Sequence, residues 1–320
     1  MASIICGSIA YDTIMTFEGR FQDQILPEQI HILNVAFLVP SMRREFGGCA
    51  GNIGYNLQLL GGKPLIMATV GADADPYLSH LERLGISRQF IKKLDQAFTA
   101  QAMITTDLAN NQITAFHPGA MNDSHTNRVG DCIAHLSNND RHIGIVAPDG
   151  RIGMWEHCHQ FSQAKIPFIF DPGQGLPMFN GQELLELVDL ATYVAVNDYE
   201  GEMLCQRTGL SLHELANRLE ALIITKGAQG AQIHAQGKVI DIPAVPAEKI
   251  ADPTGCGDAF RGGLLYGLEK GLDWETTGRL ASLMGSIKIA HQGPPKTINQ
   301  RALKLVIASR LLLGRLLPSK

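Results

Sequence analysis

The pattern of hydrophobic and polar positions changes period several times along the chain. Residues 2–6 form an apolar run that ends at Gly7 and Ser8, which predicts a buried first strand followed by a turn. Residues 13–46 show no single period. They contain alternating pieces such as HILNVAFLV, residues 31–39, so we expect strands and loops there, outside the layers of helices.

Helical spacing begins after a first pair of glycines. In the stretch CAGNIGYNLQLLGG, Ile53, Leu57 and Leu60 recur on one helical face, and a second pair of glycines ends the pattern. The following PLIMATVG predicts a strand. The segment DADPYLSHLERLG then predicts a second helix, with Asp75 as its N-terminal cap and Gly85 at its end.

The remaining chain alternates between strands and helices after one hairpin. FTAQAMITTD and QITAFHPG are two β-branched, alternating runs joined by LANN, which predicts a β-hairpin. Strands are expected at HIGIVAP, IPFIFDPG, TYVAVN and ALIIT, and helices at GRIGMWEHCHQFSQAK and DYEGEMLCQRTG. AQIHAQGKVIDIP predicts a second hairpin, and GDAFRGGLLYGLEKG and WETTGRLASLMGSIKIAHQG predict two further helices.

Strands separated by helices at this spacing are typical of a parallel sheet that is covered on both faces. The segments 13–46 and 97–118 break the alternation, and we interpret them as a small β-sheet lid. The predicted fold class is therefore α/β, with a central, mostly parallel sheet flanked by helices and a small β-sheet lid. Neither an internal repeat nor a low-complexity linker divides the chain, which predicts one domain over residues 1–320.

Composition narrows the possible function classes. The chain has 320 residues, of which 45% are hydrophobic and 18% charged, as in ordinary soluble proteins. A formal net charge of −4 argues against a nucleic-acid partner. Since no segment reaches about 18 consecutive apolar residues and the N-terminus lacks the features of a secretory signal, we expect no membrane partner. Six cysteines without a C-x-x-C pair predict a reduced, cytoplasmic protein.

The stretch DPTGCGDAFRGG, residues 252–263, carries the clearest chemical signal. Gly255 and Gly257 allow successive backbone N–H groups to converge on an anion, and a helix beginning near Asp258 adds the positive end of its dipole. No G-x-x-x-x-G-K-[ST] loop occurs, and the turn after the first strand is not a dinucleotide fingerprint. The turn therefore predicts a phosphate site of another kind.

A carboxylate beside an anion site is expected where an attacking hydroxyl must lose its proton while a phosphoryl group is transferred. We therefore predict Asp258 as a general base, with the amides of Gly255, Cys256 and Gly257 as an anion hole. The alternative is that Asp258 only caps the helix.

Three further motifs accompany this turn: GGCAGN at 47–52, VNDYEGE at 196–202 and TKGAQG at 225–230. In this order and spacing they resemble the PfkB family of carbohydrate kinases, which has the ribokinase-like fold. The resemblance covers essentially the whole chain. DPTGCGD is similar to the family signature D-T-x-G-A-G-D, with Pro253 and Cys256 as departures that leave the amides of the glycine turn in place.

The resemblance implies a role for each matching residue. It makes Asp258 the catalytic base and residues 255–257 the anion hole, and it implies ATP and Mg²⁺ as cofactors. Asn197 and Glu200 would support Mg²⁺ through water and phosphate, although a simple helix cap is the alternative for this pair. The residues that would hold ATP are Asn197, Thr225, Gly227 and Gly230, and those that would grip sugar hydroxyls are Asp12, Gly47, Gly48 and Asn52. For Asp12 the alternative is a turn acid at the end of a strand.

The predicted hairpin bears on the acceptor, because it carries Phe98, Gln101, Phe116 and His117. Aromatic side chains that face a cleft stack on a purine with about 1–3 kcal/mol per base. Packing within the lid or a dimer contact is the alternative. FHPGA and GCGDAFRGGLLYGL look more like the bacterial adenosine kinases than like ribokinase or the phosphofructokinase branch.

The preferred prediction is an ATP-dependent kinase that phosphorylates the 5′-hydroxyl of a purine nucleoside, with adenosine first and inosine and guanosine open. Gln101 and Phe116 would bind this substrate. The alternatives are a sugar kinase of ribokinase type and a non-catalytic nucleoside-binding regulator.

Some expectations concern less specific signals. The resemblance implies, for some members, a monovalent cation such as K⁺ near a loop at 292–296, and a homodimer through the lid is a further expectation. Arg261 is expected either to steady a phosphate or to be a solvated helix charge. His157, Cys158 and His159 are neighbours on a predicted helix and point in different directions, so we do not expect a metal site there. Residues 303–317 predict an amphipathic closing helix.

Overall fold

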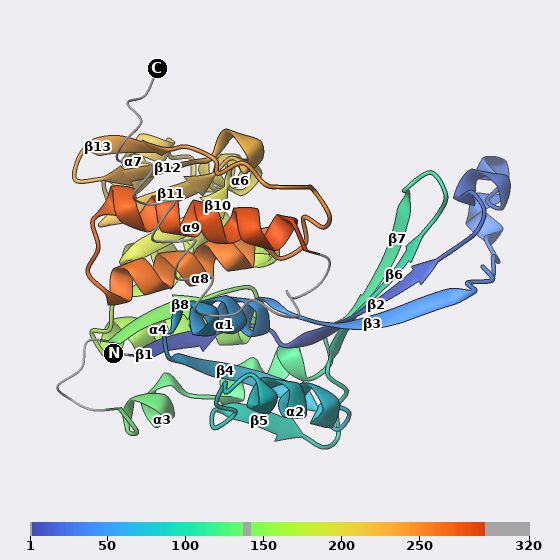
Figure 1. Cartoon of the computed structure of the whole chain (residues 1–320), viewed down its shortest axis with the longest axis horizontal. Coiled ribbons are helices and arrows are strands. Elements are labelled where there is room, and N and C mark those ends of the chain that lie inside the picture. The colour runs from blue at the N-terminus through green and yellow to red at the C-terminus, as the bar shows by residue number, and fades with distance from the viewer. Residues whose placement is uncertain (1, 137–141, 292–320) are drawn as a thin grey trace.

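The computed structural model describes residues 2–136 and 142–291, which form a large central sheet and a smaller second sheet (Figure 1). The central sheet has nine strands, in the spatial order β13 (Lys238–Ile242), β12 (Ala231–Ala235), β11 (Ala221–Thr225), β10 (Tyr193–Asn197), β9 (Phe168–Phe170), β8 (His142–Val146), β1 (Ala2–Cys6), β4 (Pro64–Gly71) and β5 (Ile91–Leu94). Neighbouring strands from β11 to β5 run parallel, whereas β12 and β13 are joined as antiparallel strands at one edge. The predicted, mostly parallel sheet is confirmed.

Helices cover both faces of the central sheet and enclose two hydrophobic cores (Figure 1). One face is covered by α1 (Cys49–Leu60), α2 (Asp75–Arg83), α8 (Cys256–Glu269) and α9 (Trp274–Ile289). The other is covered by α3 (Val129–Ile133), α4 (Arg151–Gln163), α5 (Gly181–Leu190), α6 (Asp198–Thr208) and α7 (Leu212–Ala216). Side chains alternate between the two cores along β1, where Ile5 enters the first core and Ile4 and Cys6 enter the second.

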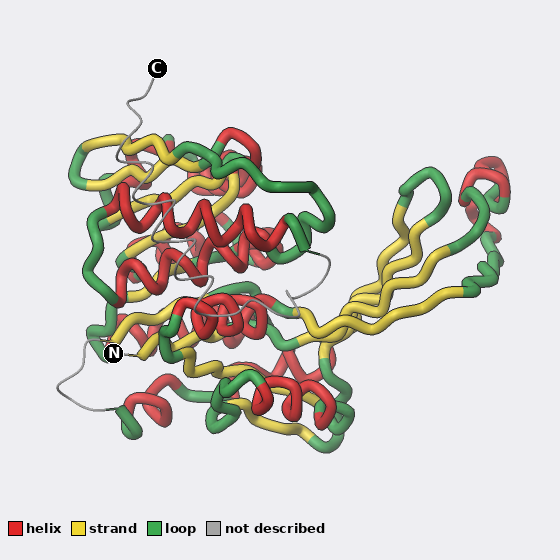
Figure 2. Tube along the Cα trace, in the orientation of Figure 1, coloured by secondary structure: helices red, strands yellow, loops and turns green. Residues whose placement is uncertain are grey.

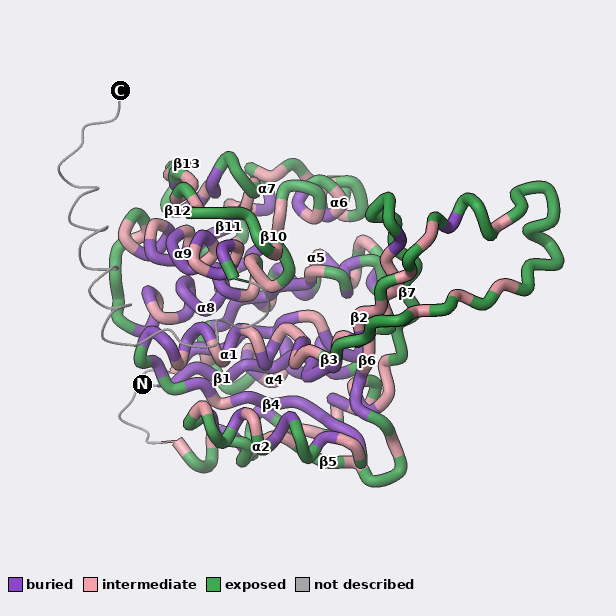
Figure 3. Tube along the Cα trace, turned by 45° about the vertical axis from the view of Figure 1, so that its right-hand side comes forward, coloured by how far each residue is buried: buried purple, intermediate pink, exposed green. Residues whose placement is uncertain are grey.

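The second sheet, which we call the lid sheet, projects from the body (Figures 1 and 2). Its strands lie in the order β3 (Ser41–Gly47), β2 (Ala10–Thr16), β6 (Ala100–Thr106) and β7 (Gln112–His117). β2 and β6 are parallel, and each pairs antiparallel with its outer neighbour. Burial is concentrated in the body, whereas the outer strands β3 and β7 of the lid sheet and the tip of the lid are mostly exposed (Figure 3).

The alternating piece at 31–39 does not form a strand. It begins within a short 3₁₀ helix, η2 (Pro27–Ile32), and continues as an irregular connection to β3. The reason is that β2 already pairs with residues 41–47, so the piece has no strand beside it within the described chain, and Leu38 is 84% exposed. The other 3₁₀ helices are η1 (Phe21–Asp23), η3 (Gly119–Thr126), η4 (Gly173–Met178) and η5 (Gly227–Gln229).

The predicted cap of α2 is also wrong. Asp75 is the first residue of the helix, Ala74 occupies the cap position, and no side chain caps this end. The Asp75 carboxylate instead accepts a hydrogen bond from Lys93 Nζ on β5 at 2.6 Å. None of the helices that the structure describes is long and apolar enough to cross a membrane. The predictions for 292–296 and 303–317 fall outside the described residues.

Candidate active site

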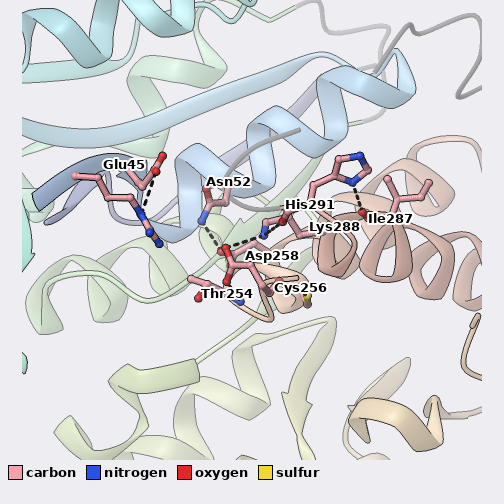
Figure 4. A network of polar contacts seen from close by, with 10 residues as sticks. Glu45, Asn52, Thr254, Cys256, Asp258, Ile287, Lys288 and His291 are labelled. Atoms are coloured by element: carbon pink, nitrogen blue, oxygen red, sulfur yellow. Dashed lines mark hydrogen bonds and ion pairs between the residues drawn. The ribbon is translucent and has the colours of Figure 1, made fainter. Parts of the chain in front are cut away.

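The glycine turn at 252–258 opens directly into helix α8. Gly255 occupies the cap position with φ of +75°, a conformation that favours glycine, and α8 begins at Cys256 without a side-chain cap. The Asp258 carboxylate lies in the first turn, where Oδ2 accepts a hydrogen bond from Asn52 Nδ2 at 2.9 Å (Figure 4). Asp258 is therefore directed across to α1, and the interpretation of this residue as a simple helix cap is not supported.

The surroundings of Asp258 change its acidity. Its pKa is raised to about 6, chiefly by burial and also by the charge of Asp171, while the Asn52 hydrogen bond and Arg261 oppose the rise. The residue keeps partial contact with solvent. A carboxyl group with such a pKa is ionised at neutral pH and is a stronger base than an ordinary aspartate, as a proton acceptor requires.

Arg261, one turn after Asp258, forms a buried ion pair. Its Nε and Nη2 atoms donate to the two carboxylate oxygens of Asp171 at 3.0 Å each, and Nη2 also donates to the Ala195 carbonyl at 3.2 Å. Asp171 follows β9 and Ala195 lies in β10. Arg261 is thus not a solvated helix charge; it joins α8 to the middle of β10 and to Asp171 at the carboxyl end of β9, the edge at which parallel sheets of this kind bind ligands.

Asn197 and Glu200 form a capping box at the start of α6. The Asn197 side chain accepts from the Glu200 N–H at 2.7 Å, and the Glu200 carboxylate accepts from the Asn197 N–H at 2.8 Å. The cap that we considered as an alternative is therefore present. Burial raises the pKa of Glu200, and Asp171 adds to the rise.

The residues at the start of α6 suit Mg²⁺ only if the ion is held through water and phosphate. Among residues 2–136 and 142–291, no cluster of three or more His, Cys, Asp or Glu side chains could enclose a metal ion. Mg²⁺ commonly keeps several waters and binds through few carboxylates together with substrate phosphates. Glu200 and Asn197 suit such a site, in which water and phosphate are the direct ligands.

The predicted ATP turn lies at the same edge of the sheet. Thr225 ends β11 and is the register partner of Asn197 at the end of β10. Gly227 and Gly230, with φ of +53° and +90°, shape the turn between β11 and β12. The structure thus brings Asn197, Glu200 and this turn to neighbouring strand ends.

The base of the lid sheet meets the start of α1. Gly48 caps α1 with φ of +87°, and a Cβ there would lie 2.6 Å from the Ala10 nitrogen. A Cβ on Gly47 would collide with the Asp12 carboxylate, so Asp12 is seated directly against this glycine. Burial raises the pKa of Asp12, with additional effects from Glu45 and Asp252. Asn52, which is bonded to Asp258, follows in α1. The segment 47–52 therefore contacts Asp12 at one end and Asp258 at the other.

Strand register separates the predicted lid residues onto two faces. Asp12, Ala102 and Phe116 form one cross-strand row, so their side chains share a face. Gln101 lies in the next row, and its Nε2 donates to Thr13 Oγ1 at 2.6 Å. The structure therefore does not bring Gln101 together with Asp12. Phe116 is 52% exposed on the Asp12 face.

Three site residues were missed from the sequence. Asp171 follows a predicted strand, and its position at a carboxyl end was a usable signal. Glu45 is the register partner of Asp12, and its Oε1 atom forms an ion pair with Arg43 Nε at 3.4 Å. Lys288 Nζ lies 3.5 Å from Asp252 Oδ2, a contact that depends on tertiary packing and has no local sequence signal (Figure 4).

Comparison with known proteins adds to this geometry. Residues 19–300 match the family described as pfkB family carbohydrate kinase. The Burkholderia thailandensis nucleoside kinase in complex with inosine is 56% identical with a TM-score of 0.84, over 96% of this chain and 97% of that chain. Its complex described as ADP-inosine is 57% identical with a TM-score of 0.82, over 96% and 95%. The Methanocaldococcus jannaschii nucleoside kinase is 30% identical over 302 residues, 92% of either chain.

Proposed function

The chain belongs to the pfkB family of carbohydrate kinases and is a phosphotransferase with a hydroxyl group as acceptor, and we propose that it is an ATP-dependent nucleoside kinase. The acceptor that we propose is the 5′-hydroxyl of a purine nucleoside. The observation that carries the proposal is the Asn52–Asp258 hydrogen bond, which joins the anion-hole turn to the segment that seats Asp12. The similarity to a nucleoside kinase that binds inosine supports the acceptor class.

In the proposed mechanism, Asp12 accepts hydrogen bonds from ribose hydroxyls and so orients the 5′-hydroxyl toward Asp258. Asp258 takes the hydroxyl proton while the oxygen forms a bond to the γ-phosphorus of ATP; the bond from that phosphorus to the β,γ-bridging oxygen breaks in line, and ADP leaves. The amides of Gly255, Cys256 and Gly257 hold the negative charge that develops. ATP would lie along Asn197 and the Thr225–Gly230 turn. Asn197 and Glu200 would hold Mg²⁺ through water, and the ion would supply positive charge near the phosphates.

The lid sheet supplies the proposed contact with the base. Phe116 lies in the same row as Asp12, so a ribose on Asp12 brings the attached purine toward the Phe116 ring. Flat stacking on an aromatic ring discriminates little between purines. We therefore propose adenosine, which the sequence favoured, and inosine as acceptors, with guanosine as a further candidate.

The acceptor class is tested by a panel of purine nucleosides and sugars, with ADP release as the readout. We expect adenosine or inosine to give the highest kcat/KM, because Phe116 adds base contacts that a free sugar lacks. A higher value for ribose or fructose 6-phosphate than for every nucleoside would contradict the proposal and favour the ribokinase-type alternative.

Replacement of Phe116 by leucine is expected to raise KM for the preferred nucleoside by about tenfold, since base stacking contributes about 1–3 kcal/mol. KM for ribose should stay unchanged, because ribose has no base to stack. Gln101→Met is the matched control, since Gln101 belongs to the adjacent row on the opposite face of the lid sheet. Equal changes in the two variants, or an equal loss for ribose, would show that Phe116 only supports the fold of the lid.

We also propose a homodimer formed through the lid. The segment 26–42 carries six large apolar side chains that are at least half exposed: Leu26, Ile30, Ile32, Leu33, Leu38 and Met42. Exposed apolar side chains that gather into a patch commonly mark an interface. Light scattering coupled to size exclusion is expected to give twice the chain mass of 34.8 kDa. Replacement of Ile30 and Leu38 by glutamate should then give a monomer, and a wild-type monomer would contradict the proposal.

A further inference from the structure

Lys288 is a buried lysine behind the anion-hole turn. It lies in the last turn of α9 and is 7% exposed. Its ammonium group is 3.5 Å from Asp252 Oδ2 and 3.4 Å from the His291 carbonyl oxygen (Figure 4). Burying a charge costs free energy unless the charge is paired, and Asp252 provides the pairing charge for Lys288.

The aliphatic part of the Lys288 side chain lies against the glycine turn. A Cβ placed on Gly255 would be 3.6 Å from Lys288 Cε. Burial raises the pKa of the Cys256 thiol, and the charge of Lys288 opposes that rise, so its field reaches the turn. Lys288 therefore lies close to Gly255 and acts electrostatically on Cys256, two of the three residues whose amides form the proposed anion hole.

The surrounding backbone holds the start of the turn on α9. The N–H groups of Ala251 and Asp252 both donate to the Ile289 carbonyl, at 2.8 and 3.1 Å. Asp252 Oδ1 in turn accepts from the Thr254 N–H at 2.9 Å. One carboxylate thus links the turn to the C-terminal end of α9, where a positive charge is favoured by the helix dipole.

We propose that Lys288 is a positioning residue of the phosphoryl-transfer site, a built-in cation that holds Asp252 and gives the anion hole a fixed positive charge. The proposal rests on the proposed kinase function.

It has a consequence for monovalent cations. K⁺ takes carboxylate and carbonyl oxygens as ligands, and the Asp252 and His291 oxygens already face an ammonium group. The described residues at this position therefore do not fit a K⁺ site, and we expect the kinase to need no K⁺ there.

The experiment compares wild type, Lys288→Ala and Lys270→Ala in tetramethylammonium buffer, with added K⁺, methylammonium or methanol. Lys270 is the control, because it is exposed at the end of α8 and lies over the Tyr266 ring. We expect K⁺ to change the wild-type kcat by less than about twofold. Lys288→Ala should lose about 10- to 100-fold in kcat, somewhat less than removal of a direct anion-hole donor, with little change in the acceptor KM.

Methylammonium should restore at least about a tenth of the kcat that Lys288→Ala loses. Methanol, which has a similar size and no charge, should not restore it. Lys288→Met fills the space without charge and should show the same loss if the alanine variant folds poorly. A wild-type requirement for K⁺, a folded Lys288 variant with the wild-type kcat, or equal rescue by methanol would overturn the proposal. All rates use the best wild-type acceptor, so a sugar acceptor would refute the nucleoside assignment and leave this comparison intact.

Discussion

Replacement of Asp258 by asparagine is expected to lower kcat about a thousandfold, within the range that general-base catalysis contributes. Asparagine has the same shape and can still accept the hydrogen bond from Asn52, so the turn and α8 should keep their structure. It cannot take a proton from the attacking hydroxyl. Steady-state rates, calorimetric titration with a non-hydrolysable ATP analogue and thermal unfolding together measure the effect.

A loss confined to kcat is the expected pattern for a base that acts in the transition state. Asp273→Asn is the matched control, because Asp273 caps α9 by accepting from the Thr276 N–H at 2.8 Å and asparagine is an equally good cap. The control should keep wild-type kcat and stability. If Asp258→Asn lowers nucleotide affinity and stability as much as kcat, Asp258 is a structural residue.

The pH dependence gives an independent readout of the same assignment. Because burial raises the pKa of Asp258 to about 6, the basic form is present above that pH and is lost as the pH falls through it. The wild-type kcat/KM should therefore decrease about tenfold per pH unit below about 6. An unshifted aspartate would retain activity to about pH 4. The residual activity of Asp258→Asn should lack this limb.

Replacement of Arg261 by methionine is expected to destabilise the protein by about 3–5 kcal/mol, because it leaves the Asp171 carboxylate buried without its partner. Activity should also fall, since Arg261 connects the helix of Asp258 to Asp171 after β9 and to the backbone of β10. Urea denaturation at pH 7 measures the change in the free energy of unfolding.

The exposed pair Arg218 and Asp189 offers a matched control, because Arg218 Nη1 contacts both carboxylate oxygens at 2.7 and 3.0 Å. Arg218→Met should cost less than about 1 kcal/mol, as surface ion pairs do. Addition of Asp171→Asn to Arg261→Met should recover part of the lost stability, because it removes the unpaired charge. Similar costs for Arg261 and Arg218 would show that burial does not govern the pair.

Local periodicity predicted most of the body of the fold, although not the edge strand β5 or the helices α3, α5 and α7. The run PLIMATVG became β4 at the predicted residues, and the alternation of strands and helices identified the parallel sheet. The piece at 31–39 shows where this fails, because alternation alone does not supply a pairing partner. Helix α5 was not predicted, although Asn180 and Glu183 form a capping box that the sequence contains.

Some residues of the candidate site could be predicted from local motifs, and others depend on strand register or tertiary structure. Motif spacing predicted Asp12, Asn52 and Asp258 as site residues. In the structure Asp12 lies against Gly47, and Asn52, five residues later, donates a hydrogen bond to Asp258. Gln101 required knowledge of strand register, since a shift of one residue changes the face of a side chain. The partners Arg261 and Asp171 are 90 positions apart, so only tertiary structure relates them.

The central claim is that the acceptor is a purine nucleoside, and a competition measures this most directly. Adenosine, inosine and ribose are supplied at equal concentration with limiting ATP, and the products are identified by mass spectrometry. Product ratios in such a mixture give the ratios of kcat/KM. We expect nucleoside 5′-monophosphates to account for nearly all of the transferred phosphoryl groups. Ribose phosphate as the main product would contradict the account.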